Sequence, residues 1–127
     1  MIHPTIEEFK RIATPGTMVP VHRDIVADLE TPVSAYMKIS KGNQYSFLLE
    51  SVEKADTIGR YSFLGANPSI VFNSKGTSVS LTRDGKETKF ESDDPLNELK
   101  KLMAEFKPVS IEGVPEFHGG AVGYMSY

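Results

Sequence analysis

The residues whose chemistry is most informative lie in the run FLLESVE, from Phe47 to Glu53. Its apolar half is typical of a buried strand, and Glu50 and Ser51 follow with no Gly, Pro or Asn to end that strand. The Glu50 carboxylate could accept hydrogen bonds from the ammonium group of a free amino acid. The Ser51 hydroxyl and nearby backbone N–H groups could donate hydrogen bonds to the carboxylate of the same ligand.

The geometry of a strand limits this interpretation. Neighbouring side chains of a regular strand point to opposite faces, so Glu50 and Ser51 can reach one ligand only where the strand ends or bulges. An apolar ligand side chain would then rest on Leu48 or Leu49. From these residues alone, the simpler interpretation is favoured, in which Glu50 and Ser51 mark the solvated end of a strand.

The other polar motifs predict structural roles, so we predict no catalytic residue and no metal site. The glycines of GGAVG, residues 119–123, precede neither a helix nor the acidic residue that a dinucleotide-binding motif needs. They favour a strand that bulges or packs closely. His3, His22 and His118 are far apart in the sequence, and none has a second ligand at helical spacing.

Composition excludes several classes of function. The chain has 127 residues, a net charge of −3 and no cysteine, so it forms no disulfide and has no clustered positive charge for nucleic acid. No signal peptide and no apolar run of membrane-spanning length is visible. These features predict one cytoplasmic domain with a substantial hydrophobic core, contacting neither membrane nor nucleic acid.

Three helices are predicted from their start signals. Thr5 and Glu8 have the spacing of a capping box, Thr31-Pro32 combines an N-cap with proline at the first helical position, and Asp94-Pro95 repeats that combination. The first helix ends at Thr14-Pro15-Gly16 and the second at Gly42. An apolar stripe carries the third helix up to Pro108.

Strands fill most of the remaining chain, which makes the predicted class α+β with an antiparallel sheet. Residues 60–92 are expected to form a meander with hairpin turns at Lys75-Gly76 and Asp84-Gly85. Short edge strands are expected in the proline-containing stretch MVPVHRDIVAD, residues 18–28. Residues 121–127 are typical of a strand, and a chain that stops in mid-strand is interpreted as a cut made inside a longer protein.

Four motifs in order give the chain a recognisable pattern. TPVSAYMKI, FLLESVE, IGRYSFLGANP and FHGGAVGYMSY, together spanning Thr31 to Tyr127, resemble the N-terminal domain of anthranilate synthase component I. The resemblance implies that residues 1–127 are the regulatory domain of an enzyme that converts chorismate to anthranilate in tryptophan biosynthesis. It also implies a separate, absent catalytic domain that uses Mg²⁺, and ammonia supplied by a glutamine amidotransferase subunit. The fragment alone is expected to be inactive and to hold no cofactor.

The same resemblance implies a role for the FLLESVE run. In that family the Leu-Leu-Glu-Ser motif marks the feedback site for L-tryptophan, which here places Leu49, Glu50 and Ser51 at the ligand. Ser51 is the foremost contact, and the indole would add a large apolar contact to the leucines. Arg60 is a weaker candidate, for which a structural ion pair is the favoured interpretation.

Two alternatives stay open. In the first, the parent is para-aminobenzoate synthase component I, whose N-terminal domain is similar and which differs from anthranilate synthase at catalytic residues beyond Tyr127. In the second, the chain is a scaffold that contacts the catalytic domain and the amidotransferase without binding a small molecule. Unpaired strand edges and an apolar face would then lead the fragment to self-associate.

Overall fold

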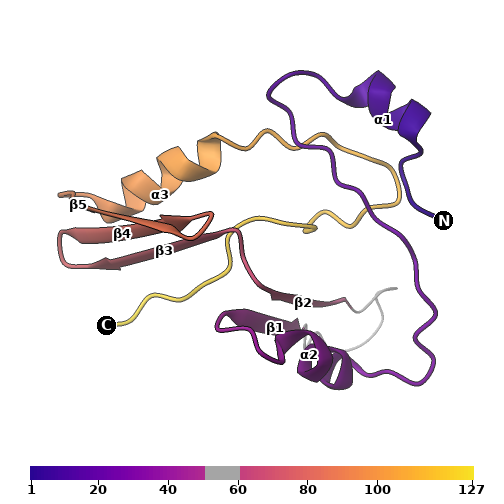
Figure 1. The fold of residues 1–127 in the computed structure, drawn as a ribbon, viewed down its shortest axis with the longest axis horizontal. Helices are drawn as coiled ribbons and strands as arrows, with labels where there is room; N and C mark the ends of the chain where they lie inside the picture. Colours follow the sequence, from indigo (N-terminus) through magenta and orange to yellow (C-terminus); the bar gives the residue numbers. More distant parts are fainter. Residues whose placement is uncertain (51–60) are drawn as a thin grey trace, which may run out of the picture. The chain divides into compact units, whose positions relative to one another are not determined.

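The structure is a computed structural model that describes residues 1–50 and 61–127 (Figure 1). It divides into two compact units. Unit 1 comprises Met1–Val26, Ser74–Val79 and Phe90–Tyr127, and unit 2 comprises Ala27–Asn73 and Ser80–Lys89. The predicted α+β class is confirmed, since the described residues form three helices and two small antiparallel sheets instead of one larger sheet.

The first two helices begin at the predicted caps. The Thr5 hydroxyl accepts from the backbone N–H of Glu8, and the Glu8 carboxylate accepts from the backbone N–H of Thr5 at 2.8 Å. Thr31 and Ser34 form the equivalent reciprocal pair, with Ser34 in place of the usual Glu or Gln. The elements are α1 (Ile6–Ile12) and α2 (Pro32–Ser40).

The third helix, α3 (Pro95–Ala104), starts as predicted and ends earlier. The Asp94 carboxylate caps it by accepting from the backbone N–H of Asn97 at 3.1 Å. At the other end the N–H of Glu105 bonds the carbonyls of Leu102 and Met103, which tightens the final turn well before Pro108. The apolar stripe therefore extends further along the chain than the helix itself.

The smaller sheet pairs β1 (Ser46–Glu50) with β2 (Ser62–Ala66) in antiparallel register. Assigning β2 to the following meander was wrong, and the stretch after β2 explains why. Asn67 turns the chain with a φ of 54°, its backbone N–H bonds the Tyr45 carbonyl, and Pro68 has no N–H to continue a ladder. Among the described residues, β2 therefore pairs with β1 and not with β3.

The larger sheet contains the two predicted hairpins in the order β3-β4-β5. Asp84 and Gly85 have φ values of 51° and 75°, the left-handed pair that a two-residue hairpin turn requires, and Gly76 has a φ of 60° at the other turn. Figure 1 shows the three strands following one another through these turns. Their bounds are β3 (Ile70–Lys75), β4 (Ser78–Arg83) and β5 (Lys86–Glu91).

Two strand predictions are wrong. Residues 18–28 form only isolated bridges, in which Met18 pairs with Pro108 and His22 pairs with His3. Residues 121–127 form no strand, and within the described part of the chain they have no backbone ladder. An apolar alternating pattern becomes a strand only when its N–H and C=O groups find a neighbouring strand, and neither stretch has one here.

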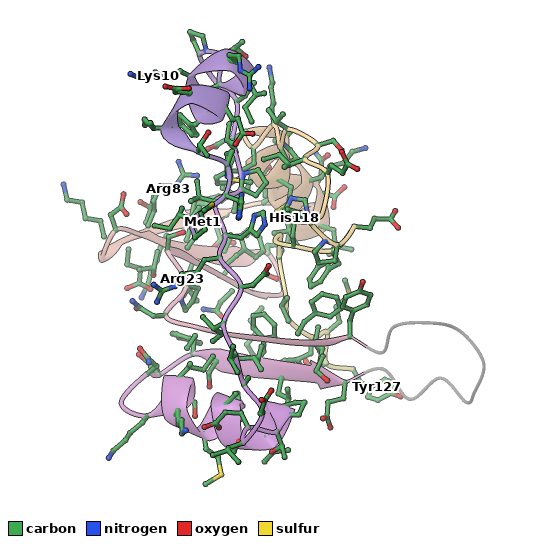
Figure 2. The ribbon with its side chains drawn as sticks, turned by 90° about the vertical axis from the view of Figure 1, so that its right-hand side faces the viewer. Met1, Lys10, Arg23, Arg83, His118 and Tyr127 are labelled. Carbon is green, nitrogen blue, oxygen red and sulfur yellow. The ribbon has the colours of Figure 1, made fainter. Side chains whose placement is uncertain are left out.

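The hydrophobic core is much smaller than the composition predicts. Among the described residues only Val79 and Leu102, both in unit 1, are buried apolar side chains, with exposed fractions of 2% and 8%. Leu29 and Tyr124 are almost fully exposed, as is Tyr127, which is labelled in Figure 2. Much of the apolar content therefore faces solvent in this structure, and Leu102 and Val79 are the described apolar side chains that gain most from burial.

Glu91 of β5 offers a test of the β4–β5 hairpin. Its carboxylate accepts hydrogen bonds from the hydroxyls of Thr77 at 2.6 Å and Ser78 at 2.8 Å, and these bonds lower its pKa below the ordinary 4.5. Because the pKa of Glu91 is lower in the folded state, its ionised carboxylate stabilises the fold at pH values above 4.5. This stabilisation is lost as the pH falls through the lowered pKa. We expect Thr77→Val with Ser78→Ala to move the Glu91 pKa, followed by carboxyl NMR, back toward 4.5. An unchanged titration would show that the hydroxyls do not bond Glu91 in solution.

Candidate functional site

The candidate site lies where β1 ends. Leu49 and Glu50 are the last two residues of this strand, and they pair with Phe63 and Ser62 of β2. Two of the predicted ligand residues, Ser51 and Arg60, lie outside the described residues. The described part of the site consists of the end of β1 and the start of β2.

Helix α2 covers one face of the β1–β2 sheet. It contacts both strands, and the hydroxyls of Tyr36 and Ser46 are 2.9 Å apart (Figure 1). Since side chains alternate along a strand, Leu48 and Glu50 share the α2 face with Ser46, while Leu49 lies on the opposite face. Leu49 and Glu50 thus point to opposite faces of the sheet, and a ligand must lie at the strand end to reach both.

The face away from α2 is aromatic. Phe47 and Leu49 of β1 lie on it opposite Gly65 and Phe63 of β2. The ring of Phe63 stacks with that of Tyr61, with centroids 6.0 Å apart and 23° between the planes. Leu49 is 43% exposed and Tyr61 is 56% exposed, so this aromatic surface reaches solvent beside the end of β1.

Sequence reasoning missed this aromatic surface. The sequence signal for this surface is the alternation of Tyr61, Phe63 and Gly65 in RYSFLGA. In a strand these three residues lie on the same face, with two aromatic rings followed by a glycine that has no side chain. As a strand of the predicted meander, β2 would pair with β3, and these rings would then lie away from Leu49. Only the pairing of β2 with β1 brings these rings next to Leu49.

Glu50 is the charged residue at the described end of β1. Its side chain is exposed, and among the described residues it has neither a hydrogen-bond nor an ion-pair partner. Glu8 and Glu30, by contrast, have lowered pKa values because they already accept hydrogen bonds, Glu8 from Thr5 and Glu30 from Lys38 and Ser34. An unpaired carboxylate next to an apolar aromatic surface can accept an ammonium group while the rest of the ligand lies on the rings.

The described residues contain no group of three or more His, Asp or Glu side chains that could hold a metal ion. No helix among them is both long enough and apolar enough to cross a membrane.

Comparison with known proteins finds homologues of the chain. No protein-family model and no solved structure matches the chain. Anthranilate synthase component 1 of Synechocystis sp. is 40% identical and that of Acetivibrio thermocellus 37% identical, each across the whole chain. The chain is homologous to anthranilate synthase component 1. The resemblance inferred from four sequence motifs is confirmed.

The anthranilate synthase relatives are much longer than this chain. It spans 25% and 26% of the Synechocystis and Acetivibrio proteins. Anthranilate synthase alpha subunit 2 of Arabidopsis thaliana, a chloroplastic protein, is 40% identical over 94% of the chain, which covers 21% of that relative. About three quarters of each anthranilate synthase relative thus has no counterpart in these 127 residues.

Proposed function

We propose that this chain is the tryptophan-binding regulatory part of an anthranilate synthase component I. The whole protein would convert chorismate to anthranilate in tryptophan biosynthesis, with Mg²⁺ in its catalytic part and ammonia from a glutamine amidotransferase subunit. L-Tryptophan would bind at the end of β1 as a feedback inhibitor. Support comes from the homology to anthranilate synthase component 1 and from the chemistry of the strand end.

The observation that carries this proposal is the exposed Glu50 carboxylate at the end of β1, where the aromatic surface on the other face of the sheet also reaches solvent. The ammonium group of tryptophan needs an acceptor, and Glu50 has no competing partner in the described residues. The indole needs apolar contact, which Leu49 and the stacked rings of Tyr61 and Phe63 offer. Ser51, at the next position in the chain, has the hydroxyl that would donate to the ligand carboxylate.

Inhibition at this site requires linkage to the catalytic part. A ligand shifts the enzyme between active and inactive arrangements only when it binds one of them better. Moving the equilibrium from 1:99 to 99:1 requires a difference of about 5.5 kcal/mol in binding free energy. Part of that difference would arise in residues that contact the ligand from the catalytic part, so this chain alone is expected to bind tryptophan more weakly than the whole protein does.

Binding can be measured through the fluorescence of the ligand. The chain contains no tryptophan, so the indole emission of added L-tryptophan reports on the ligand alone. We expect its anisotropy to rise saturably, and Glu50→Gln to raise the dissociation constant roughly ten- to hundredfold, because a charge-assisted hydrogen bond is lost. Ser51→Ala is expected to weaken binding in the same direction.

The matched control is Glu112→Gln, which removes the same charge from an exposed position in a loop. It should leave the dissociation constant unchanged. Equal loss in the Glu50 and Glu112 variants would show that net charge, and not the strand end, governs binding. A saturable signal untouched by Glu50→Gln would place the ligand elsewhere on the chain.

A scaffold role is the second candidate, and the small core favours it. Large apolar side chains such as Leu29 and Met125 are exposed, as expected for a chain that is completed by contacts with other protein surface. In that case the chain would shape the enzyme without holding a small molecule. No rise in anisotropy at millimolar tryptophan, with the chain shown to be folded, would support the scaffold over the sensor.

A further inference from the structure

Two histidines that are distant in the sequence meet in unit 1. The backbone N–H of His3 bonds the carbonyl of His22, the reverse bond also forms, and both N···O distances are 2.7 Å. The pair is antiparallel, so the two side chains project from directly opposite positions of the bridge. Their ring centroids are 5.7 Å apart with 31° between the planes.

This separation is close to that of two imidazoles bound to one metal ion. With nitrogens about 2.0–2.1 Å from a tetrahedral Zn²⁺, the two ring centroids would lie about 5 Å apart. Both residues are half-buried side chains of a backbone-bonded pair, so small rotations about their side-chain bonds would close the remaining gap without altering the bridge. The backbone bridge thus holds the two ring centroids near the spacing that a shared ion requires.

The surroundings of the rings also favour an added partner. The Nδ1 atom of His22 is buried and has no hydrogen-bond partner, which is a costly state for an imidazole nitrogen. The Glu8 carboxylate of α1 lies within electrostatic range of His3, with Arg11 of the same helix partly offsetting its charge. An ion on the two rings would be attracted by Glu8 and could give the Nδ1 atom of His22 the partner that it lacks.

We propose that His3 and His22 form a two-histidine site for a divalent cation of intermediate softness such as Zn²⁺. Neutral imidazole is a preferred ligand of Zn²⁺, and water would fill the remaining coordination positions. Because the described residues offer no third protein ligand, the site is an open, exchangeable one. The bound ion would close the loop that contains α1, between residues 3 and 22, and so fix the N-terminal end of unit 1.

The test is a Zn²⁺ titration followed by NMR of the histidine rings. We expect the ring signals of His3 and His22 to shift along one shared saturation curve. His118, whose Nδ1 lies 3.0 Å from the Pro115 carbonyl and which belongs to no pair, should not shift over the same range. In His22→Gln, the His3 ring should lose its saturable shift, and His3→Gln should do the same to His22.

His118→Gln is the matched control and should leave the shared curve intact. The backbone amide spectrum of each variant checks that the fold survives, which is expected because the bridge is made by backbone groups. The proposal is overturned if His118 shifts at the same Zn²⁺ concentrations as the pair, if His22→Gln leaves the His3 curve unchanged, or if millimolar Zn²⁺ shifts neither ring. None of these outcomes bears on tryptophan binding, because the variants leave β1 and β2 unchanged.

Discussion

Leu102→Ala is expected to lower the free energy of unfolding by about 2–5 kcal/mol, the largest effect of any single side-chain truncation among the described residues. Leu102 is 8% exposed and lies in the last turns of α3, in a unit with only one other buried apolar side chain in its described residues. Truncation removes apolar contacts and leaves a cavity that the surrounding backbone fills only in part. Urea unfolding followed by circular dichroism measures the change.

Leu96→Ala is the control for that variant. It makes the same chemical change in the first turn of the same helix, where the side chain is 57% exposed. We expect a change within about 0.5 kcal/mol, as for an ordinary surface substitution. Similar losses in the two variants would mean that α3 does not bury the Leu102 face in solution.

Gly65→Ala is expected to destabilise the β1–β2 sheet by about 1–3 kcal/mol. A Cβ built on Gly65 would lie 2.6 Å from Cε1 and 2.9 Å from Cζ of the Phe47 ring across the sheet. The half-buried Phe47 side chain can move only by rotation about two torsions. It must therefore leave the aromatic surface, or the two strands must move apart. Unfolding measurements give the stability change, and tryptophan anisotropy should show weaker binding as the surface is disturbed.

Two further variants identify the cause of that loss. Gly119→Ala adds the same methyl where no atom lies within 4 Å, and it should cost little. Phe47→Leu removes the ring that Gly65→Ala meets, so the double variant should be less unstable than the two single effects added together. Simple additivity would show that the Gly65 effect comes from the backbone and not from Phe47.

Local signals in the sequence were sufficient for the helix starts and the hairpin turns. Thr5, Thr31 and Asp94 each cap a helix as predicted, because a cap is decided by residues three positions apart. Asp84-Gly85 likewise forms its turn from its own backbone preferences. None of these features depends on how distant segments meet.

Features that depend on distant segments were harder to predict. The partner of β2 was misassigned, since RYSFLGA fits either neighbouring strand until the turn at Asn67 is taken into account. The meeting of His3 with His22 has no signal in local spacing. At the candidate site, the opposite orientations of Leu49 and Glu50 follow from strand alternation alone, whereas the aromatic surface beside them follows only from the register.

The central claim is that tryptophan binds at the end of β1, and intermolecular NOE measurements test it most directly. Every indole proton signal belongs to the ligand, because the chain has no tryptophan of its own. We expect NOEs from the indole protons to Leu49 and to the rings of Tyr61 and Phe63. Indole contacts confined to other residues at saturating ligand, or none at all, would contradict it.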